Sequence, residues 1–317
     1  MRSLALLSCL LVLAPACGGG SSDSAQAPVI VETVESAKEA ESGALPGWTA
    51  QLLAETGPEV ALVFSTSDYG VGENRVGFLV VRDDGQLVQS PTATVHVALE
   101  GSSEPAETMA MLEPVGPHVD PPGSPPHDHL DGTDIYVAQL DLPESGRYWV
   151  VVQPAGARIQ AVGTLDVRER TLSPPVGAQA ISSDNPTLDD APAEEITTAS
   201  PPDIELLRYS IGDSLAAKTP FVVVFATPKF CQSRTCGPTV EVVDEVRQEI
   251  GPQVRFIHVE IYEDNDPQKG PNRWVEEWNL PSEPFTFVVD RDGVIRAKFE
   301  GSVSAGELEA AVREHLL

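Results

Sequence analysis

The sequence predicts a multidomain protein in which an all-β domain precedes an α/β domain. A chain of 317 residues exceeds the usual size of one domain, so we expect two. Short β-rich runs with turn residues between them fill residues 47–168, whereas strands alternate with helical patterns over residues 204–317. Residues 169–203 are rich in Pro, Ser and Asp and predict a linker that lies against the second domain.

The N-terminus has the pattern of an export signal. Met1–Arg2 carries a positive charge and Leu4–Leu13 is apolar, with small residues after it. This apolar run is shorter than the roughly 20 residues that span a bilayer. We therefore expect residues 1–16 to be a signal peptide and not a membrane helix.

A lipidation motif follows the apolar run. Ala14-Pro15-Ala16-Cys17 resembles a bacterial lipobox, with Ala14 in the place where such motifs usually carry Leu. The resemblance implies a lipoprotein in which lipidated Cys17 becomes the mature N-terminus, residues 17–46 are a flexible tether, and the protein faces the periplasm or cell exterior. The alternative is ordinary secretion without a lipid anchor.

Net charge and cysteine content restrict the possible partners. The chain has 20 basic and 48 acidic residues, a net charge of -28, and nucleic-acid binding needs a basic face. We therefore expect no nucleic-acid partner. Of the four cysteines, Cys9 lies in the signal peptide and Cys17 in the lipobox, which leaves Cys231 and Cys236 for the folded part. In an exported protein, such a pair is a structural disulfide or a redox couple.

Residues 47–168 predict an immunoglobulin-like β-sandwich. Asp83-Asp84-Gly85-Gln86 is a hairpin signal between two apolar runs. Leu142–Tyr148 resembles the tyrosine-corner entry to a late strand of immunoglobulin-like domains. The predicted strands are Val60–Ser65, Val76–Arg82, Thr94–Leu99, Thr108–Leu112, Ile135–Leu142, Tyr148–Gln153 and Val162–Val167.

Residues 204–317 predict the element order β-α-β-α-β-β-α after a short first helix. Phe221–Phe225 is a continuous apolar run, as expected of a buried central strand. Gly251-Pro252 ends a helix with apolar residues at helical spacing, and Ser304 and Glu307 have capping-box spacing. The other predicted elements are helices at Ser210–Lys218, Asn272–Asn279 and Ser304–Leu316 and strands at Val254–Tyr262, Phe285–Val289 and Val294–Phe299.

Two motifs within this order resemble the thioredoxin-like superfamily. Phe225–Cys231 looks like the approach to a thioredoxin active site, and Pro284–Ile295 resembles the segment that begins at the cis-proline of exported, cytochrome-maturation-type thioredoxins. The resemblance covers roughly the last third of the chain. It implies a redox position for Cys231 and Cys236 and a cis Pro284 that faces them.

The cysteine spacing departs from thioredoxin, because four residues separate Cys231 from Cys236 and thioredoxins have two. Residues five apart on one helix have Cα atoms about 8.6 Å apart, beyond the reach of a disulfide. The helix could start at Gly237-Pro238, leaving both cysteines in a loop. Alternatively it starts near Cys231, as the thioredoxin alignment favours, and unwinds on oxidation.

Proton handling departs from thioredoxin as well. Thioredoxins have a buried acid in the strand before the active site, and Phe221–Phe225 has none. Formation of a thiolate would depend on the helix dipole, Lys229 or Arg234.

These features predict a thiol–disulfide oxidoreductase that acts on protein thiols and disulfides, with Cys231 attacking, Cys236 resolving and Pro284 lining the site. The spacing also resembles the cysteine pair of one peroxiredoxin class, although Pro228 stands where that class needs Thr or Ser. A non-catalytic scaffold with a structural Cys231–Cys236 disulfide is a further alternative.

Copper binding is the metal alternative, and otherwise no cofactor is expected. His118, His127 and His129 fall in one predicted loop, preceded by Met109 and Met111 on one strand face. Imidazole and thioether ligands suit copper, although a solvated loop and two core methionines explain the same residues. Trp274, Trp278 and His258 are expected in the core.

Overall fold

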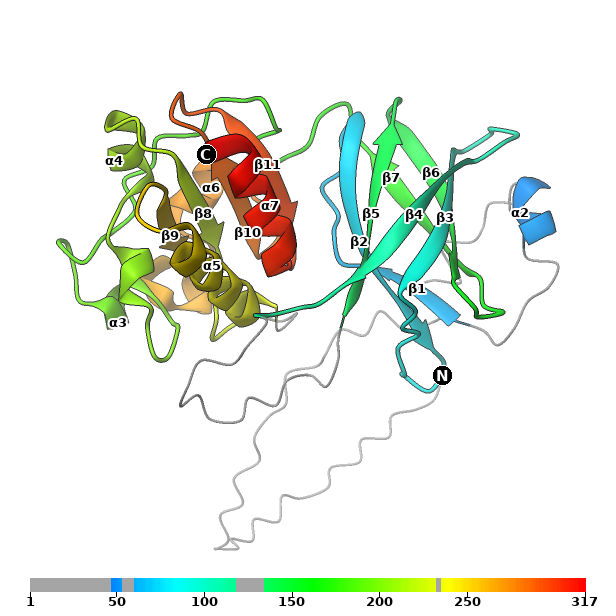
Figure 1. The fold of residues 1–317 in the computed structure, drawn as a ribbon, viewed down its shortest axis with the longest axis horizontal. Helices are drawn as coiled ribbons and strands as arrows, with labels where there is room; N and C mark the ends of the chain where they lie inside the picture. Colours follow the sequence, from blue (N-terminus) through cyan, green and yellow to red (C-terminus); the bar gives the residue numbers. More distant parts are fainter. Residues whose placement is uncertain (1–46, 53–59, 118–133, 232–234) are drawn as a thin grey trace, which may run out of the picture. The chain divides into compact units, whose positions relative to one another are not determined.

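The computed structural model describes residues 47–52, 60–117, 134–231 and 235–317 of the chain (Figure 1). The expected signal peptide and tether, with Cys17, lie outside these ranges, as do His118, His127 and His129. The described residues belong to one compact unit. In the described ranges, no helix is both long and apolar enough to cross a membrane.

The all-β part is a seven-stranded antiparallel sheet with the strand order β1-β2-β5-β4-β3-β6-β7. A short helix, α2 (Gly47–Leu52), packs Trp48 against Trp149. The strands are β1 (Val60–Phe64), β2 (Gly72–Arg82), β3 (Thr92–Leu99), β4 (Ala106–Glu113), β5 (Ile135–Leu142), β6 (Gly146–Pro154) and β7 (Ala161–Val167).

The seven strands form one continuous sheet, and not the two separate sheets of the predicted sandwich. The sheet folds over on itself, so that edge strands β1 and β7 approach each other. A Cβ on Gly163 of β7 would lie 2.9 Å from the ring of Phe64 on β1. One hydrophobic core takes residues from all seven strands, which gives the domain a sandwich-like or barrel-like form (Figure 1).

The corner between β5 and β6 has the contacts that the tyrosine-corner motif predicts. The Tyr148 hydroxyl donates to the Glu144 carbonyl at 2.9 Å and accepts from the Glu144 N–H at 3.2 Å. Both bonds join the start of β6 to the turn before it. The ring of Tyr148 is buried in the core, so the corner is anchored there.

The C-terminal part contains a mixed four-stranded sheet with the order β11-β10-β8-β9. Strands β8 and β9 are parallel, and β10 is antiparallel to both β8 and β11. The strands are β8 (Phe221–Phe225), β9 (Arg255–Val259), β10 (Phe285–Val289) and β11 (Ile295–Glu300), close to the predicted bounds.

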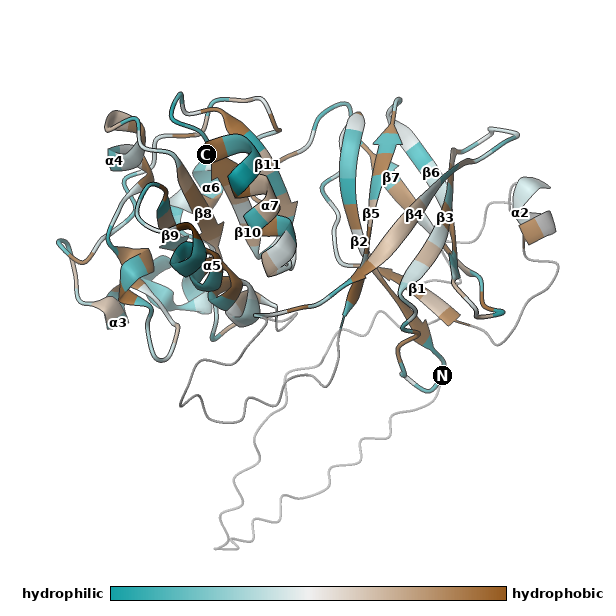
Figure 2. Cartoon of the chain, in the orientation of Figure 1, coloured by the Kyte–Doolittle hydropathy of each residue, from teal (hydrophilic) through white to brown (hydrophobic). Residues whose placement is uncertain are grey.

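Helices cover both faces of this sheet, since alternate residues of the fully buried β8 enter two different cores (Figure 2). Val222 and Val224 pack with α5 and α7, whereas Phe221, Val223 and Phe225 pack with α4 and α6. The predicted Ser304–Glu307 capping box is present at the start of α7. The helices are α4 (Ile211–Ala216), α5 (Cys236–Ile250), α6 (Arg273–Glu277) and α7 (Ala305–Leu316).

Residues 169–203 lie along the C-terminal sheet and helices. Ala180 N–H donates to the Gly293 carbonyl at 2.8 Å, and Ile181 packs in the core beside α4 and α6. Further along, the segment forms α3 (Ala193–Ile196), and the 3-10 helix η2 (Ile204–Leu207) follows. The segment is therefore packed structure as well as a connection.

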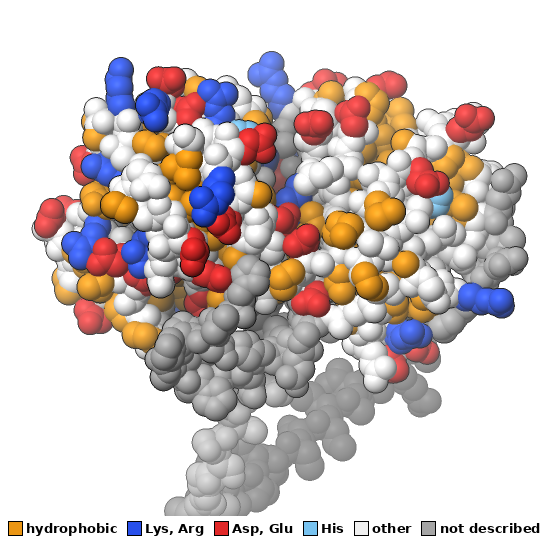
Figure 3. Space-filling model, viewed as in Figure 1, with side chains coloured by type: hydrophobic (Ala, Val, Ile, Leu, Met, Phe, Trp, Pro, Cys, Tyr) orange, Lys and Arg blue, Asp and Glu red, His pale blue; other side chains and the backbone are white. Residues whose placement is uncertain are grey.

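Polar contacts join the β domain to the C-terminal sheet. The Glu300 carboxylate on β11 accepts from the N–H groups of Ser67 and Asp68, both at 2.8 Å. The fully buried Asp68 carboxylate accepts in turn from the N–H groups of Leu172 and Ser173. On the face seen in Figure 3, acidic and basic side chains are interspersed.

Candidate functional site

Cys231 lies at the end of a tight turn that follows the central strand β8. The turn runs through Pro228–Phe230, and the Cys231 N–H donates to the Thr227 carbonyl at 3.1 Å. This bond holds Cys231 near the carboxyl ends of the parallel strands β8 and β9. In α/β sheets, ligands bind beyond the carboxyl ends of the strands.

Helix α5 begins at Cys236, so the expectation that it starts near Cys231 is wrong. Pro238 occupies the third position of the helix, where its missing N–H has no intrahelical acceptor to lose. Because Cys231 lies before the helix, the separation of residues five apart on one helix does not apply to the pair. The two cysteines can therefore approach each other without unwinding α5.

The structure holds Cys231 and Cys236 as two thiols that are not joined in the predicted disulfide. The Cys236 backbone N–H donates to the Cys231 Sγ at 3.3 Å. The Cys231 side chain is partly exposed, whereas that of Cys236 is buried in the core beneath α5. One sulfur is thus accessible to a partner and the other is protected.

The two thiols also differ electrostatically. A hydrogen bond to Cys231, burial and the charge of Cys231 together raise the pKa of the Cys236 thiol far above its usual range. A backbone hydrogen bond from Thr227 to the Cys236 sulfur opposes this rise in pKa only in part. Formation of a thiolate on Cys236 is therefore disfavoured in this arrangement.

Pro284 lies directly before β10 and is buried. The Glu283–Pro284 peptide bond is cis, the state that the thioredoxin resemblance implies. In the antiparallel register Phe285 pairs with Phe225, the last residue of β8. The register thereby brings Pro284 beside the segment that leads to Cys231.

Three further residues near the thiols were missed in the sequence. Burial, and then the charges of Cys231 and Glu260, raise the pKa of Glu283. Burial, and then the charges of Glu283, the two cysteines and Glu260, raise the pKa of Tyr262. The Tyr262 ring packs edge-on against Phe230, with centroids 6.3 Å apart. Two acids, Glu260 and Glu283, thus lie just beyond the strands on either side of β8.

A sequence signal for these residues exists. Glu260 directly follows β9, the parallel neighbour of β8, and Glu283 directly precedes Pro284. Because parallel strands end at the same edge of a sheet, a residue after β9 lies near the loop after β8.

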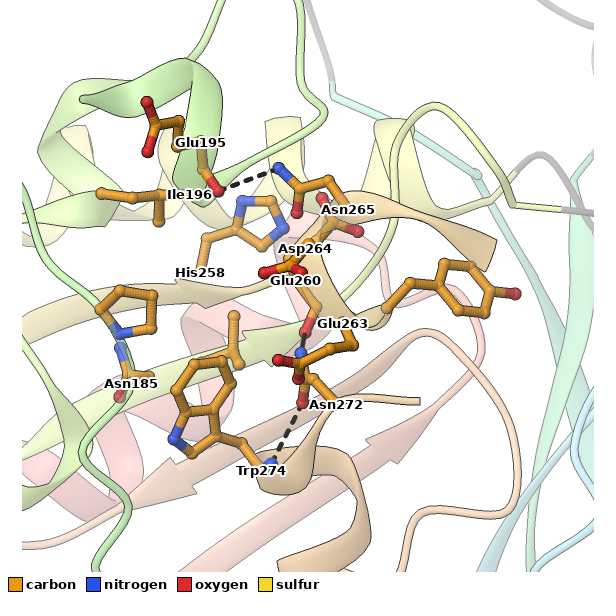
Figure 4. A pocket seen from close by; sticks show the side chains of 13 residues that line it. Asn185, Glu195, Ile196, His258, Glu260, Glu263, Asp264, Asn265, Asn272 and Trp274 are labelled. Atoms are coloured by element: carbon orange, nitrogen blue, oxygen red, sulfur yellow. Dashed lines mark hydrogen bonds between the residues drawn. The ribbon is translucent and has the colours of Figure 1, made fainter. Parts of the chain in front are cut away.

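A cavity of about 110 Å³ lies next to this group (Figure 4). Glu260 and Tyr262 line it, together with His258 and the Trp274 indole, whereas the cysteines do not. Asn272 also lines the cavity. Its side chain accepts from the Trp274 backbone N–H at 3.1 Å and donates to the Glu260 carbonyl oxygen. The cavity and the thiol group therefore share two residues.

The core residues expected near the site are largely where the sequence placed them. His258 is buried, with Nε2 3.0 Å from the Ala226 carbonyl oxygen and Nδ1 3.3 Å from Thr197 Oγ1. Trp278 is fully buried against Phe225, with ring centroids 5.2 Å apart. Trp274 is only partly buried, and its ring lies beneath the Arg273 guanidinium.

Met109 and Met111 lie on one face of β4, as expected. The alternative that they are core residues is wrong, because they are exposed at 59% and 49% of their surface. Their side chains point to the outer face of β4, where they pair with Thr94 and Thr92 of β3. Within the part of the chain that the structure describes, no group of three His, Cys, Asp or Glu side chains could hold a metal ion.

Comparisons with known proteins add little. No protein-family model matches the chain, and no curated protein matches it. Among solved structures, one similar chain is the PKD domain of the human VPS10 domain-containing receptor SorCS2, at 18% identity and a TM-score of 0.18. The match covers 35% of this chain and 75% of that one. A likeness at this score says nothing of what this chain binds or does.

Proposed function

We propose that this chain is an extracytoplasmic thiol–disulfide oxidoreductase whose C-terminal domain is thioredoxin-like. The observation that carries the proposal is the 3.3 Å contact from the Cys236 backbone N–H to the Cys231 Sγ. It holds the accessible sulfur of Cys231 beside a residue whose own sulfur is buried. A structural disulfide does not need one accessible and one buried sulfur, whereas a pair of attacking and resolving thiols does. The position of Pro284 beside the cysteine loop supports the same assignment.

The reaction that we propose is exchange with a partner disulfide. The Cys231 thiolate attacks one partner sulfur, a bond forms between them, and the other partner sulfur leaves as a thiolate. Cys236 then gives up its proton and attacks the Cys231 sulfur, which releases the second partner sulfur. The dithiol is oxidised to a disulfide, and the partner disulfide is reduced to two thiols. The reverse sequence oxidises a partner dithiol.

The N-terminal motif and the β domain complete the proposal. A lipid on Cys17 would anchor the protein to a membrane in the periplasm or at the cell exterior, where disulfides persist. The Tyr148–Glu144 corner supports an immunoglobulin-like character for the β domain. Membrane fractionation of Cys17→Ala tests the anchor: the variant should be released from the membrane, and its retention would contradict lipidation.

Trapping in cells tests the thiol chemistry. In Cys236→Ser the resolving thiol is absent, so mixed disulfides between Cys231 and partner proteins should accumulate and be identified by mass spectrometry. Cys231→Ser is the matched control and should trap none. Equal trapping by both variants, or none by either, would contradict the proposed roles. A purified Cys231–Cys236 disulfide that resists mild reduction would favour the structural scaffold.

Copper binding is the second candidate, and the exposed pair Met109 and Met111 favours it. Both side chains lie on the outer face of β4, thioether ligands suit copper, and His118, His127 and His129 follow in the sequence. Copper titration of the oxidised protein, with and without His127→Ala and His129→Ala, tests this candidate. Absence of binding below micromolar concentrations would remove it. Peroxide consumption by the reduced protein tests the peroxiredoxin alternative.

A further inference from the structure

Two carboxylates lie near the point where the chain leaves β8, one beside each of the two strands that neighbour β8 in the sheet. Phe225 pairs with Val259 on β9 and with Phe285 on β10. The next residues along those neighbouring strands are Glu260 on one side and the Glu283–Pro284 pair on the other. Neighbouring strands lie about 4.8 Å apart, so both acids are held close to the residues that follow β8.

Both cysteines are hydrogen-bonded to the backbone of the short segment that follows β8. The Thr227 carbonyl accepts from the Cys231 N–H, and the Thr227 backbone hydrogen-bonds to the Cys236 sulfur. Glu260 and Glu283 therefore lie on either side of the segment to which both cysteines are hydrogen-bonded. This register, and not sequence proximity, brings the acids to the thiols.

Among the residues that the structure describes, few positive charges lie near these acids. Glu260 is only 6% exposed, and its carboxylate accepts from the Thr198 N–H at 2.8 Å and the Ile261 N–H at 3.2 Å. Neither donor carries a full charge. Lys229 is exposed, and its ammonium lies 5.2 Å from the centre of the Phe230 ring, where water screens it.

Like charges that lie close together repel each other. Burial is the largest cause of the raised pKa of Glu283, and the charges of Cys231 and Glu260 raise it further. The repulsion is mutual, so the carboxylates also destabilise a thiolate on Cys231. The Cys236 N–H lies at the same sulfur, and its partial positive charge offsets this repulsion only in part. A couple whose reduced form is stabilised is a strong oxidant, and destabilising the thiolate has the opposite effect.

We infer that Glu283, with Glu260, tunes the Cys231/Cys236 couple to give electrons, so that its partners are proteins with disulfides to be reduced. This inference rests on the proposed function. Two electrons pass from the dithiol to the partner: the Cys231–Cys236 bond forms, the partner disulfide breaks, and the two thiol protons pass to the partner sulfurs. Glu283 acts through the thiolate charge and is a positioning residue.

Redox equilibration of the full chain with glutathione tests the inference. The wild-type couple should lie on the reducing side of the glutathione couple, and Glu283→Gln should shift the equilibrium constant about tenfold toward the dithiol. Glu249→Gln is the matched control, because this exposed acid is on the last turn of α5, about 20 Å along the helix from Cys236. It should leave the equilibrium unchanged.

A second readout separates tuning from a loss of structure. In a Cys236→Ser background, Glu283→Gln should move the thiolate absorbance of Cys231 to lower pH, because the repelling charge is gone. An unshifted equilibrium and an unshifted titration in Glu283→Gln, or a wild-type couple more oxidising than glutathione, would overturn the inference and leave the proposed function standing. A pair that forms no reversible disulfide would overturn both.

Discussion

Arg75 on β2 and Glu307 on α7 form a two-pronged ion pair between the β domain and the C-terminal domain. Nε lies 2.8 Å from Glu307 Oε1, and Nη2 lies 2.9 Å from Oε2. The side chains are only 7% and 18% exposed. Glu307 also belongs to the capping box with Ser304, so one carboxylate both begins a helix and joins the domains.

Removal of this arginine should destabilise the protein. Arg75→Met leaves the Glu307 carboxylate with little access to water, and losing one partner of a nearly buried pair costs about 3 kcal/mol. Urea unfolding followed by tryptophan fluorescence measures the change. Arg313→Met is the control on the same helix, because its pair with Glu309 is exposed and contributes less than about 1 kcal/mol. Equal losses in the two variants would contradict an interdomain role.

Gly293, in the turn between β10 and β11, should not tolerate alanine. Its φ is +76°, and a Cβ there would lie 2.9 Å from Leu215 Cδ2. Backbone strain and overpacking should together lower the free energy of unfolding by about 2 kcal/mol. Gly85→Ala is the control, since Gly85 has a φ of +80° but open space where a Cβ would lie. In this variant only backbone strain should lower the free energy of unfolding. The thermal midpoints of the two variants measure the difference.

Asp203 should make the protein less stable as the pH rises from 4 to about 6. Burial, and then the hydrogen bond and charge of Asp244, raise the pKa of Asp203 from 3.8 to about 6. Because the folded state holds this proton more tightly, the stabilisation is complete below the unfolded pKa and lost as the pH rises through the folded pKa. Asp203→Asn, which keeps the cap on η2, should therefore stabilise the protein at pH 7 but not at pH 4.

The expected gain is small because Asp203 is only half-buried. After allowance for solvent screening, it is on the order of 1 kcal/mol at pH 7. Denaturant unfolding at the two pH values measures it. In an Asp244→Asn background the gain should become smaller but not vanish, because burial, the largest cause of the raised pKa, remains. An undiminished gain there would refute the contribution of Asp244.

The two cysteines of the reduced protein should differ in alkylation. Iodoacetamide reacts with thiolate, and Cys236 is buried with a pKa raised by Cys231. At neutral pH, Cys231 should therefore be labelled at least about tenfold faster, as peptide mass mapping would show. The same protein in urea provides the control, where both cysteines should react alike. Preferential labelling of Cys236 in the folded protein would reverse the assigned roles.

Much of the architecture could be read from local patterns. The apolar run Phe221–Phe225, the stop at Gly251 and the Ser304–Glu307 cap each depend on residues near one another in the chain, and each is present. The predicted first and last residues of the strands were less accurate. The pairing that makes one continuous sheet of β1–β7 could not be read, because it depends on contacts between distant strands.

The sequence alone established the cysteine pair, its four-residue spacing and its place after a buried strand. All three are properties of a short segment. Tertiary structure decided the rest. It began α5 at Cys236, made Cys231 the accessible sulfur, and brought Glu260 and Glu283 to the thiols. The physical reason is that sheet register, burial and like-charge repulsion act between residues far apart in the chain.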